Sequence, residues 1–339
     1  MAAVGIVTVA IAAAAVAVAA GSRQVPELPS IGADRLIASV IRSGLSPSPV
    51  SGEIDEHVDL GLPGIGDLGG FGGGGLGLLI GDHRLRVWLS ADGLRVADLL
   101  PFSERSLVVG RRGAWTWDFD SLTATRLGSV PLPGGLLGLA AVVDPTEAVR
   151  RALEALAPTT AIDVEGQTVV AGRAAYRLVI RPRTPRTLVG RVEFDVDAQH
   201  FLPLGLEVFP RGRDVAALSL RFTSVRFGSI DPSTFDFSPP PGATVRRGTG
   251  GLGAGLGSLV GGIVAVASPT GPVRVVGSGW TSVLAVPLPD RSEGPELGSL
   301  LPLSGPLFSA RVATAGGGRW LLVGPVTQDA LAAAAEALP

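Results

Sequence analysis

The chain has 339 residues, of which 46% are hydrophobic and only 17% are charged, and its formal net charge is −2. Without a basic surplus there is no electrostatic drive toward phosphate backbones, so the composition argues against a nucleic-acid partner. The absence of cysteine excludes disulfides, thiolate metal sites and lipidated cysteines. A chain of this length can form one large core domain with an appendage.

The N-terminal residues form an uncharged run of small and apolar side chains at 2–20. As a helix this run would span about 28 Å, close to the hydrocarbon core of a bilayer at about 30 Å. Small residues before Gly21 offer a cleavage site. We therefore expect residues 1–24 to be a signal peptide or a membrane anchor. The rest of the chain should then be extracytoplasmic, either secreted or anchored to the cytoplasmic membrane by this segment.

The part of the chain that follows predicts a short helix and then strands. Apolar side chains at helical spacing, from Leu36 to Ile41, favour an amphipathic helix at 33–43. Glycine dominates residues 61–77, where we expect no stable element. Alternation of apolar and polar side chains predicts strands around that stretch and a tight hairpin after them, at 50–60, 85–89, 94–100 and 107–120.

A second helix is predicted at 144–156, because Asp144, Pro145 and Glu147 suit the first turn of a helix. Residues 164–227 then alternate at period two in runs that are joined by short turns. Short links favour antiparallel neighbours, since a parallel crossover needs a dozen or more residues. The sequence therefore predicts an antiparallel meander with one apolar face.

Two glycine-rich stretches suggest how the chain is divided. The second, at 248–262, follows a proline-rich stop and is interpreted as part of a linker. We expect a main domain at 25–247, a linker at 248–272 and a C-terminal appendage at 273–339. The appendage should contain a β-hairpin and a last helix that Thr327 caps.

No motif indicates catalysis or a cofactor. Asp55, His57 and Asp59 share one predicted strand face, but without a fourth ligand they are better explained as a solvated face than as a metal site. The glycine stretches contain no P-loop signature, and the chain has no lysine to complete one. No G-x-S-x-G elbow is present. We expect a protein that is not an enzyme, with no catalytic residues, no metal and no cofactor.

The strand runs are many and the predicted helices few, and a curved antiparallel sheet with so little cover tends to enclose a cavity. The stripe formed by Trp115, Trp117 and Phe119 is typical of plain core, and it would also line such a cavity if the sheet curls. We expect the cavity to be lined by Trp115, Trp117, Phe119, Tyr176, Leu178, Ile180, Val192, Phe194, Leu204 and Leu206.

Several segments resemble the LolA-like lipoprotein-carrier superfamily, in the form found in secreted proteins of high-GC Gram-positive bacteria. The hairpin at 106–119 resembles the strand–turn–strand segment of that family, with its dG and lW-x-yD residues. Residues 170–178 resemble its v-G-r-p-a-Y-r-l strand, and 192–204 its v-D-x-x-t-x-l-P-l turn. Residues 233–245 resemble its F-x-F-x-p-P-x-G-a end. Together these motifs cover about residues 50–245.

The resemblance implies a mainly β (α+β) fold, a half-open antiparallel β-barrel covered by a few short helices. It also implies a hydrophobic cavity for the acyl chains of lipids or lipoproteins. We expect an exported, membrane-associated protein that holds acyl chains in this cavity. The alternative is an envelope sensor similar to the related RseB/MucB proteins, which would bind an anti-sigma factor or another membrane protein. If the cavity is open, Leu206→Trp should be accommodated with nearly unchanged stability.

Overall fold

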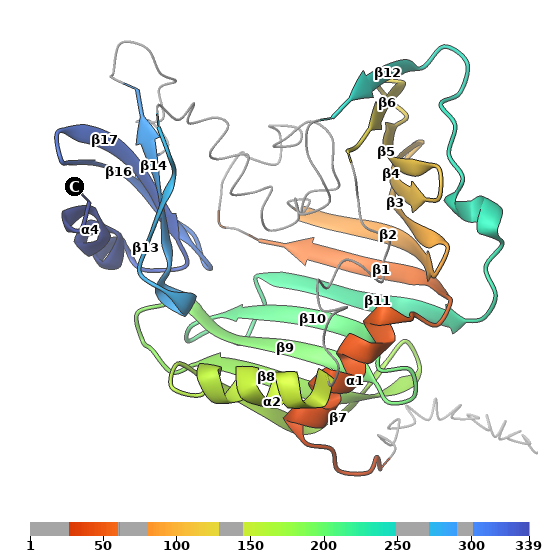
Figure 1. Cartoon of the computed structure of the whole chain (residues 1–339), viewed down its shortest axis with the longest axis horizontal. Helices are drawn as coiled ribbons and strands as arrows, with labels where there is room; N and C mark the ends of the chain where they lie inside the picture. Colours follow the sequence, from red (N-terminus) through yellow and green to blue (C-terminus); the bar gives the residue numbers. More distant parts are fainter. Residues whose placement is uncertain are drawn as a thin grey trace, which may run out of the picture.

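The computed structural model describes residues 27–59, 61, 81–128, 145–248, 271–289 and 301–338. The fold class is the expected one, mainly β with an open sheet and short helices (Figure 1). The N-terminal segment, most of the glycine-rich stretch at 61–77 and most of the linker predicted at 248–272 lie outside the described residues. Within the described ranges, no helix has the length and hydropathy that crossing a bilayer requires.

A large sheet of twelve strands forms the body of the molecule. It contains β1 (Val50–Val58), β2 (Gly81–Ser90), β3 (Gly93–Leu100), β4 (Ser103–Gly110), β5 (Gly113–Asp118), β6 (Thr123–Arg126), β7 (Thr160–Val170), β8 (Arg173–Pro182), β9 (Val189–Asp197), β10 (Pro203–Pro210), β11 (Leu218–Phe227) and β12 (Thr244–Arg247). The strand order is β12-β6-β5-β4-β3-β2-β1-β11-β10-β9-β8-β7. All neighbours are antiparallel except β12, which lies parallel to β6. The predicted meander is confirmed in β7 to β11, and β1 joins it to the β2–β6 half.

Two helices cover one side of the β7–β9 region, and we term this side the inner face. The apolar stripe of α1 (Ala33–Leu45) packs there, with Leu36 fully buried against Tyr176, Leu178 and Val196. The second helix, α2 (Pro145–Leu156), lies beside α1 (Figure 1). The segment before α1 is tied to β7, because the Gln167 amide exchanges two hydrogen bonds with the backbone of Leu28.

The opposite side, the outer face, is polar over β8–β11. Asp195 is 2% exposed and accepts hydrogen bonds from Arg177 Nε at 2.9 Å and Arg221 Nη1 at 2.7 Å. A buried carboxylate is tolerated only when charged donors satisfy it, and here two guanidinium groups do so. The alternation seen in the sequence therefore separates an apolar inner face from an ion-paired outer face.

A strap between β11 and β12 crosses the outer face of the β3–β5 region. It begins with η2 (Pro232–Phe235), where Phe235 is 3% exposed and packs over Gly93 and Gly110. Two residues on, the Phe237 ring lies 5.8 Å from the Trp115 ring and 6.1 Å from the Trp117 ring. The Phe-x-Phe motif of the sequence thus has a packing role.

The β9–β10 turn is organised around Asp197, which is fully buried. Its carboxylate accepts hydrogen bonds from the Arg173 guanidinium and from the backbone N–H of Gln199 and His200. The Phe227 ring stacks on His200 at 3.7 Å, and the Arg173 guanidinium carbon lies 4.7 Å from the same ring. Burial alone would raise the pKa of Asp197, but the hydrogen bonds and charge of Arg173, together with the His200 amide, hold that pKa below its usual value.

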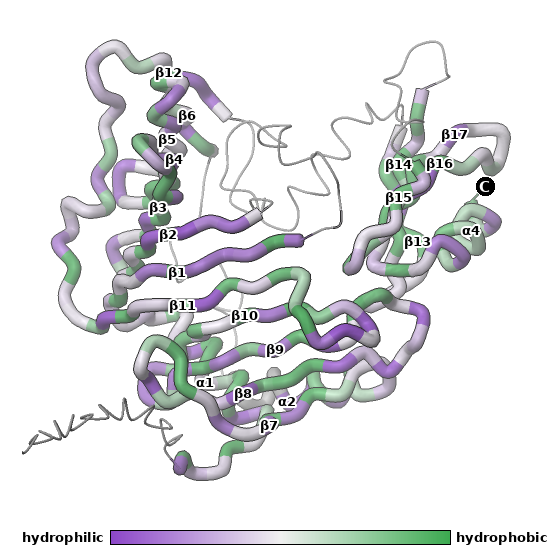
Figure 2. The backbone as a smooth tube through the Cα atoms, turned by 180° about the vertical axis from the view of Figure 1, so that it is seen from behind, coloured by the Kyte–Doolittle hydropathy of each residue, from purple (hydrophilic) through white to green (hydrophobic). Residues whose placement is uncertain are grey.

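A second sheet of five strands and a helix follow, and Figure 2 shows them beside the first sheet from behind. They are β13 (Arg274–Val276), β14 (Val283–Leu288), β15 (Leu303–Ser304), β16 (Ser309–Ala315), β17 (Gly318–Gly324) and α4 (Gln328–Glu336). Thr327 caps α4 as predicted, because its side chain accepts a hydrogen bond from the N–H of Ala330. The sheet contacts the first one through Leu188 N–H, which donates to Pro325 O at 2.8 Å. The domain boundaries at 247 and 273 stay a prediction.

The contact between the two sheets can be tested at Trp280, whose indole Nε1 donates to Thr160 Oγ1 at 2.9 Å. Trp280→Phe keeps an aromatic ring and removes this donor, so it should lower the free energy of unfolding by about 1 kcal/mol. Urea unfolding of the two proteins measures the difference. An unchanged midpoint would show that this bond does not hold the second sheet in place.

Candidate functional site

The inner face carries a strip of apolar side chains on β1, β2 and β3. Residues directly opposite each other in neighbouring strands share a face, so the pairing traces this face across the sheet. Leu206 lies opposite Leu220, and Leu220 opposite Glu56 of β1, which places the even-numbered residues of β1 on the inner face. From there the pairing continues into β2 and β3. The half-buried apolar residues of this inner strip are Ile54, Leu85, Val87, Leu89, Leu94 and Val96.

One end of the inner strip is polar. Glu56 lies opposite His83, and the Nδ1 atom of His83 is 3.3 Å from Asp98 Oδ1. Asp98 is fully buried, and its second oxygen, Oδ2, has no hydrogen-bond partner among the residues that the structure describes. A buried acceptor without a partner normally costs free energy. The inner strip therefore ends at groups that could accept hydrogen bonds from the polar head of an amphiphile.

Several residues predicted to line a cavity lie instead under α1. Tyr176, Leu178 and Phe194 pack with Leu36 of that helix. Tyr176 and Leu178 are buried, and the Tyr176 hydroxyl donates to the Pro29 carbonyl at 3.1 Å. These side chains share the inner face, as predicted, and form closed core there.

The other two residues predicted from the first strands of the meander, Ile180 and Val192, lie opposite each other. Both are half-buried on the inner face, at the ends of the strands away from the β9–β10 turn. They are separated from the inner strip by β10, β11 and part of β1.

Leu204 does not keep the regular alternation with Leu206 on which the prediction of a shared face was based. Pro203 lies opposite Val196 and Gly205 opposite Asp195, so Leu204 occupies a bulge between them. Leu204 is buried with Val170 and Ala175, and Phe222 packs against the same cluster.

Leu206 itself is on the inner face, in contact with the second part of the chain. It packs in a cluster with Leu307 and Phe308. A tryptophan there would overpack this contact, so we now expect Leu206→Trp to destabilise the protein.

The aromatic stripe is also placed differently from the prediction. Ala114 and Thr116 lie opposite the inward-facing Val109 and Leu107, which puts Trp115 and Trp117 on the outer face under Phe237. Phe119 lies past the end of β5, in a turn, and is 51% exposed. The three side chains therefore do not line a common interior with Tyr176.

The residues of the inner strip were not among those predicted to line a cavity. Their alternation was visible at 85–89 and 94–100, where the strands were expected. The missing information was which side of β2 faces inward, because that depends on the pairing of β1 with both β2 and β11. The pattern of side chains within a single strand does not indicate how β1 pairs with its two neighbours.

The described residues define the class of fold, an open and mainly antiparallel sheet with helices over its apolar face. No model of a known protein family matches the sequence, and no curated protein matches it either. Among solved structures, the LolA superfamily protein NE2245 from Nitrosomonas europaea is 9% identical, covering 61% of this chain and 99% of its own, with a TM-score of 0.25.

Two structures of MucB match over more of the chain. The MucA/MucB complex of Pseudomonas aeruginosa is 13% identical over 89% of this chain and 96% of that one, with a TM-score of 0.47. MucB in complex with MucA(peri) is 16% identical over 89% and 97%, with a TM-score of 0.49. The motifs predicted a resemblance to LolA-like and RseB/MucB proteins, and proteins of both kinds are among the solved structures that this chain resembles. Such similarity concerns the fold, and the functional proposal rests on the residues of this chain.

Proposed function

We propose that the protein binds the acyl chains of lipids or lipoproteins on its inner strip, without catalysis. The observation that supports this most directly is the inner strip itself, half-buried apolar side chains on three adjacent strands of the inner face. Each buried methylene of a ligand contributes about 0.8 kcal/mol, so a chain of about sixteen carbons would gain roughly 13 kcal/mol before the costs of association.

The polar end of the strip would orient the ligand. Asp98 Oδ2, with His83 beside it, suits a head group that donates hydrogen bonds, such as an amide or amine, better than a free carboxylate. Binding would thus bury the tail along the strip and give the orphaned oxygen a partner.

The proposed setting is outside the cytoplasm, at the membrane. The uncharged segment at 2–20 supports export or anchoring. An envelope sensor that binds an anti-sigma factor or another membrane protein is the alternative. Copurification of a membrane-spanning protein with a lipid-free chain would favour that alternative.

The proposal predicts the effect of Val87→Trp, at the centre of the inner strip. A larger ring should fill the space that the acyl chain takes and weaken displacement of a fluorescent acyl probe about tenfold, while the free energy of unfolding changes by less than about 1 kcal/mol. Displacement by hexadecylamine and by palmitate measures binding, and the amine should compete better because it carries donors.

The matched control is Arg84→Trp, which places the same ring on the outer face of the same strand, where Arg84 is exposed. It should leave probe binding unchanged. A wild-type protein that binds neither probe nor lipid, together with a strongly destabilised Val87→Trp variant, would show that the strip is ordinary core and that the proposed function is wrong.

A further inference from the structure

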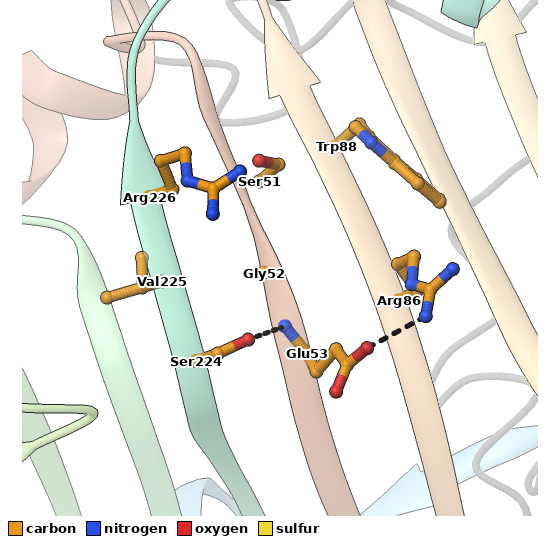
Figure 3. Close-up of a pocket in the computed structure, with 8 residues that line it drawn as sticks. All are labelled: Ser51, Gly52, Glu53, Arg86, Trp88, Ser224, Val225 and Arg226. Carbon is orange, nitrogen blue, oxygen red and sulfur yellow. Dashed lines mark hydrogen bonds and ion pairs between the residues drawn. The ribbon is translucent and has the colours of Figure 1, made fainter.

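A trough on the outer face lies between β11, β1 and β2, on the side of the sheet away from the inner strip. It has a volume of about 320 Å³. Its floor is β1 at Ser51 and Gly52, which present only a hydroxyl and backbone (Figure 3). In Figure 3 the Arg226 side chain reaches from β11 over Ser51, and Arg86 and Trp88 stand on the β2 side.

Among the described residues that line the trough, Arg226 is a cation with no carboxylate paired to it. Glu53 Oε1 accepts a hydrogen bond from Arg86 Nη2 at 2.8 Å, so these two charges offset each other. Within the described part of the chain, Arg226 makes no ion pair, and its side chain is exposed. The trough therefore carries a net positive charge at Arg226.

Hydroxyl donors accompany this charge. Ser51 is the cross-strand neighbour of both Arg226 and Trp88, so its side chain lies between them. Ser224 Oγ accepts a hydrogen bond from Glu53 N–H at 3.2 Å, which leaves the Ser224 hydroxyl proton to donate. Arg86 also keeps N–H groups that Glu53 does not use.

On the β3 side of Trp88, Arg95 adds a positive charge and an N–H donor that the described residues do not use. Arg95 lies opposite Trp88, and its guanidinium carbon is 5.6 Å from the Trp88 ring. Glu104 offsets this charge at 3.3 Å, but Arg95 Nε is buried and has no hydrogen-bond partner in the described ranges. Cationic donors thus flank Trp88 on both sides.

We propose that this trough binds a phosphate ester, with the phosphate at Arg226 and the hydroxyls, and the esterified group against Trp88. Two guanidinium groups and two hydroxyls, set on opposite walls, can reach separate oxygens of a tetrahedral oxyanion, whereas a planar carboxylate uses a single arginine fork. The trough is larger than one phosphate group, which leaves room for the organic group that is esterified to the phosphate. This site is independent of acyl binding, because it occupies the other face of the sheet.

The experiment follows the indole N–H signal of Trp88 by NMR, identified by its loss in Trp88→Phe. Inorganic phosphate and glycerol 3-phosphate should shift it saturably, and acetate at the same concentrations should not. Arg226→Gln should weaken phosphate binding about tenfold, because it removes a positive charge that the described residues leave unpaired. Arg226 is exposed, so the variant is expected to fold.

The matched control is Arg84→Gln, which removes an equal charge from the same face, outside the trough, where Arg84 pairs with Asp55 at 3.4 Å. It should not weaken binding. Acetate that saturates at the same concentration as phosphate, no shift with any phosphate, or equal losses in the two variants would each overturn the proposal.

The phosphate ester could belong to a lipid head group or to a soluble or polymer-borne molecule, and vesicle binding distinguishes these two sources. Cosedimentation of the wild type, and not of Arg226→Gln, with phosphatidylglycerol vesicles would identify a lipid head group as the ligand. Phosphatidylcholine vesicles control for the bilayer itself. Binding of glycerol 3-phosphate without vesicle binding would support the same site with a soluble or polymer-borne phosphate ester.

Discussion

Gly110→Ala is expected to destabilise the protein by about 3 kcal/mol or more, since overpacking against an unyielding neighbour is costly. A Cβ atom at this position would lie 2.2 Å from the carbonyl oxygen of Phe235 and 3.1 Å from its carbonyl carbon. The obstacle is backbone, so no side-chain rotation relieves it. The strap would have to leave the outer face of β4 and expose Phe235. Urea unfolding monitored by tryptophan fluorescence measures the loss.

Gly128→Ala is the matched control, because no atom of the described residues lies within 4 Å of a Cβ added there. It should change the free energy of unfolding by less than about 0.5 kcal/mol. Shortening the neighbouring ring in Phe235→Leu should not rescue Gly110→Ala, as the clash is with the carbonyl. A rescued double variant, or a single variant as stable as the control, would contradict the close approach of strap and strand.

Asp197→Asn is expected to cost about 3 kcal/mol, the low end for removing one partner of a buried ion pair. The side chain is fully buried, and the amide cannot offset the charge of Arg173 or accept all the hydrogen bonds that the carboxylate accepts. The β9–β10 turn, which places His200 against the Phe227 ring, would also become less well ordered in this variant. Thermal or urea unfolding at neutral pH gives the size of the effect.

The same substitution has a defined pH dependence. The pKa of Asp197 in the folded protein is below that of the unfolded chain, which is about 3.9. The carboxylate therefore contributes its full stability above the unfolded pKa, and this contribution is lost as the pH falls through the lower, folded pKa. The difference between wild type and Asp197→Asn should be constant near neutral pH and shrink below about pH 4. A difference independent of pH would exclude the ionised carboxylate as its cause.

Local signals in the sequence were sufficient for much of the fold. The alternation around Tyr176 and Phe194 and the short turns between the runs predicted an antiparallel meander, and β8 to β11 are paired in that way. The capping residue Thr327 correctly predicted where the last helix begins. The short strands β6 and β12 were not predicted, because four-residue strands with polar residues owe their conformation to pairing partners.

The candidate site was less accessible to prediction because it depends on register. The pairing of β1 with β11 shifts between Glu53 and Ile54, and that of β10 with β9 shifts at Leu204. Each bulge adds a residue and changes which side chains share a face. The face of Trp115 follows only after the pairing has been traced across every strand from β9 to β5. A single sequence does not contain that information.

The pairing of β1 with β11 also affects the order in which the chain can fold during synthesis. Val58 of β1 lies opposite Leu218 of β11. At about 5–20 residues per second, a ribosome makes the second strand roughly ten to thirty seconds after the first. The meander of β7 to β10 can form in that time from contacts close in the chain, whereas one edge of β1 has no partner. The nascent protein thus exposes a strand edge for many seconds, and β1 is the segment that a chaperone would have to shield.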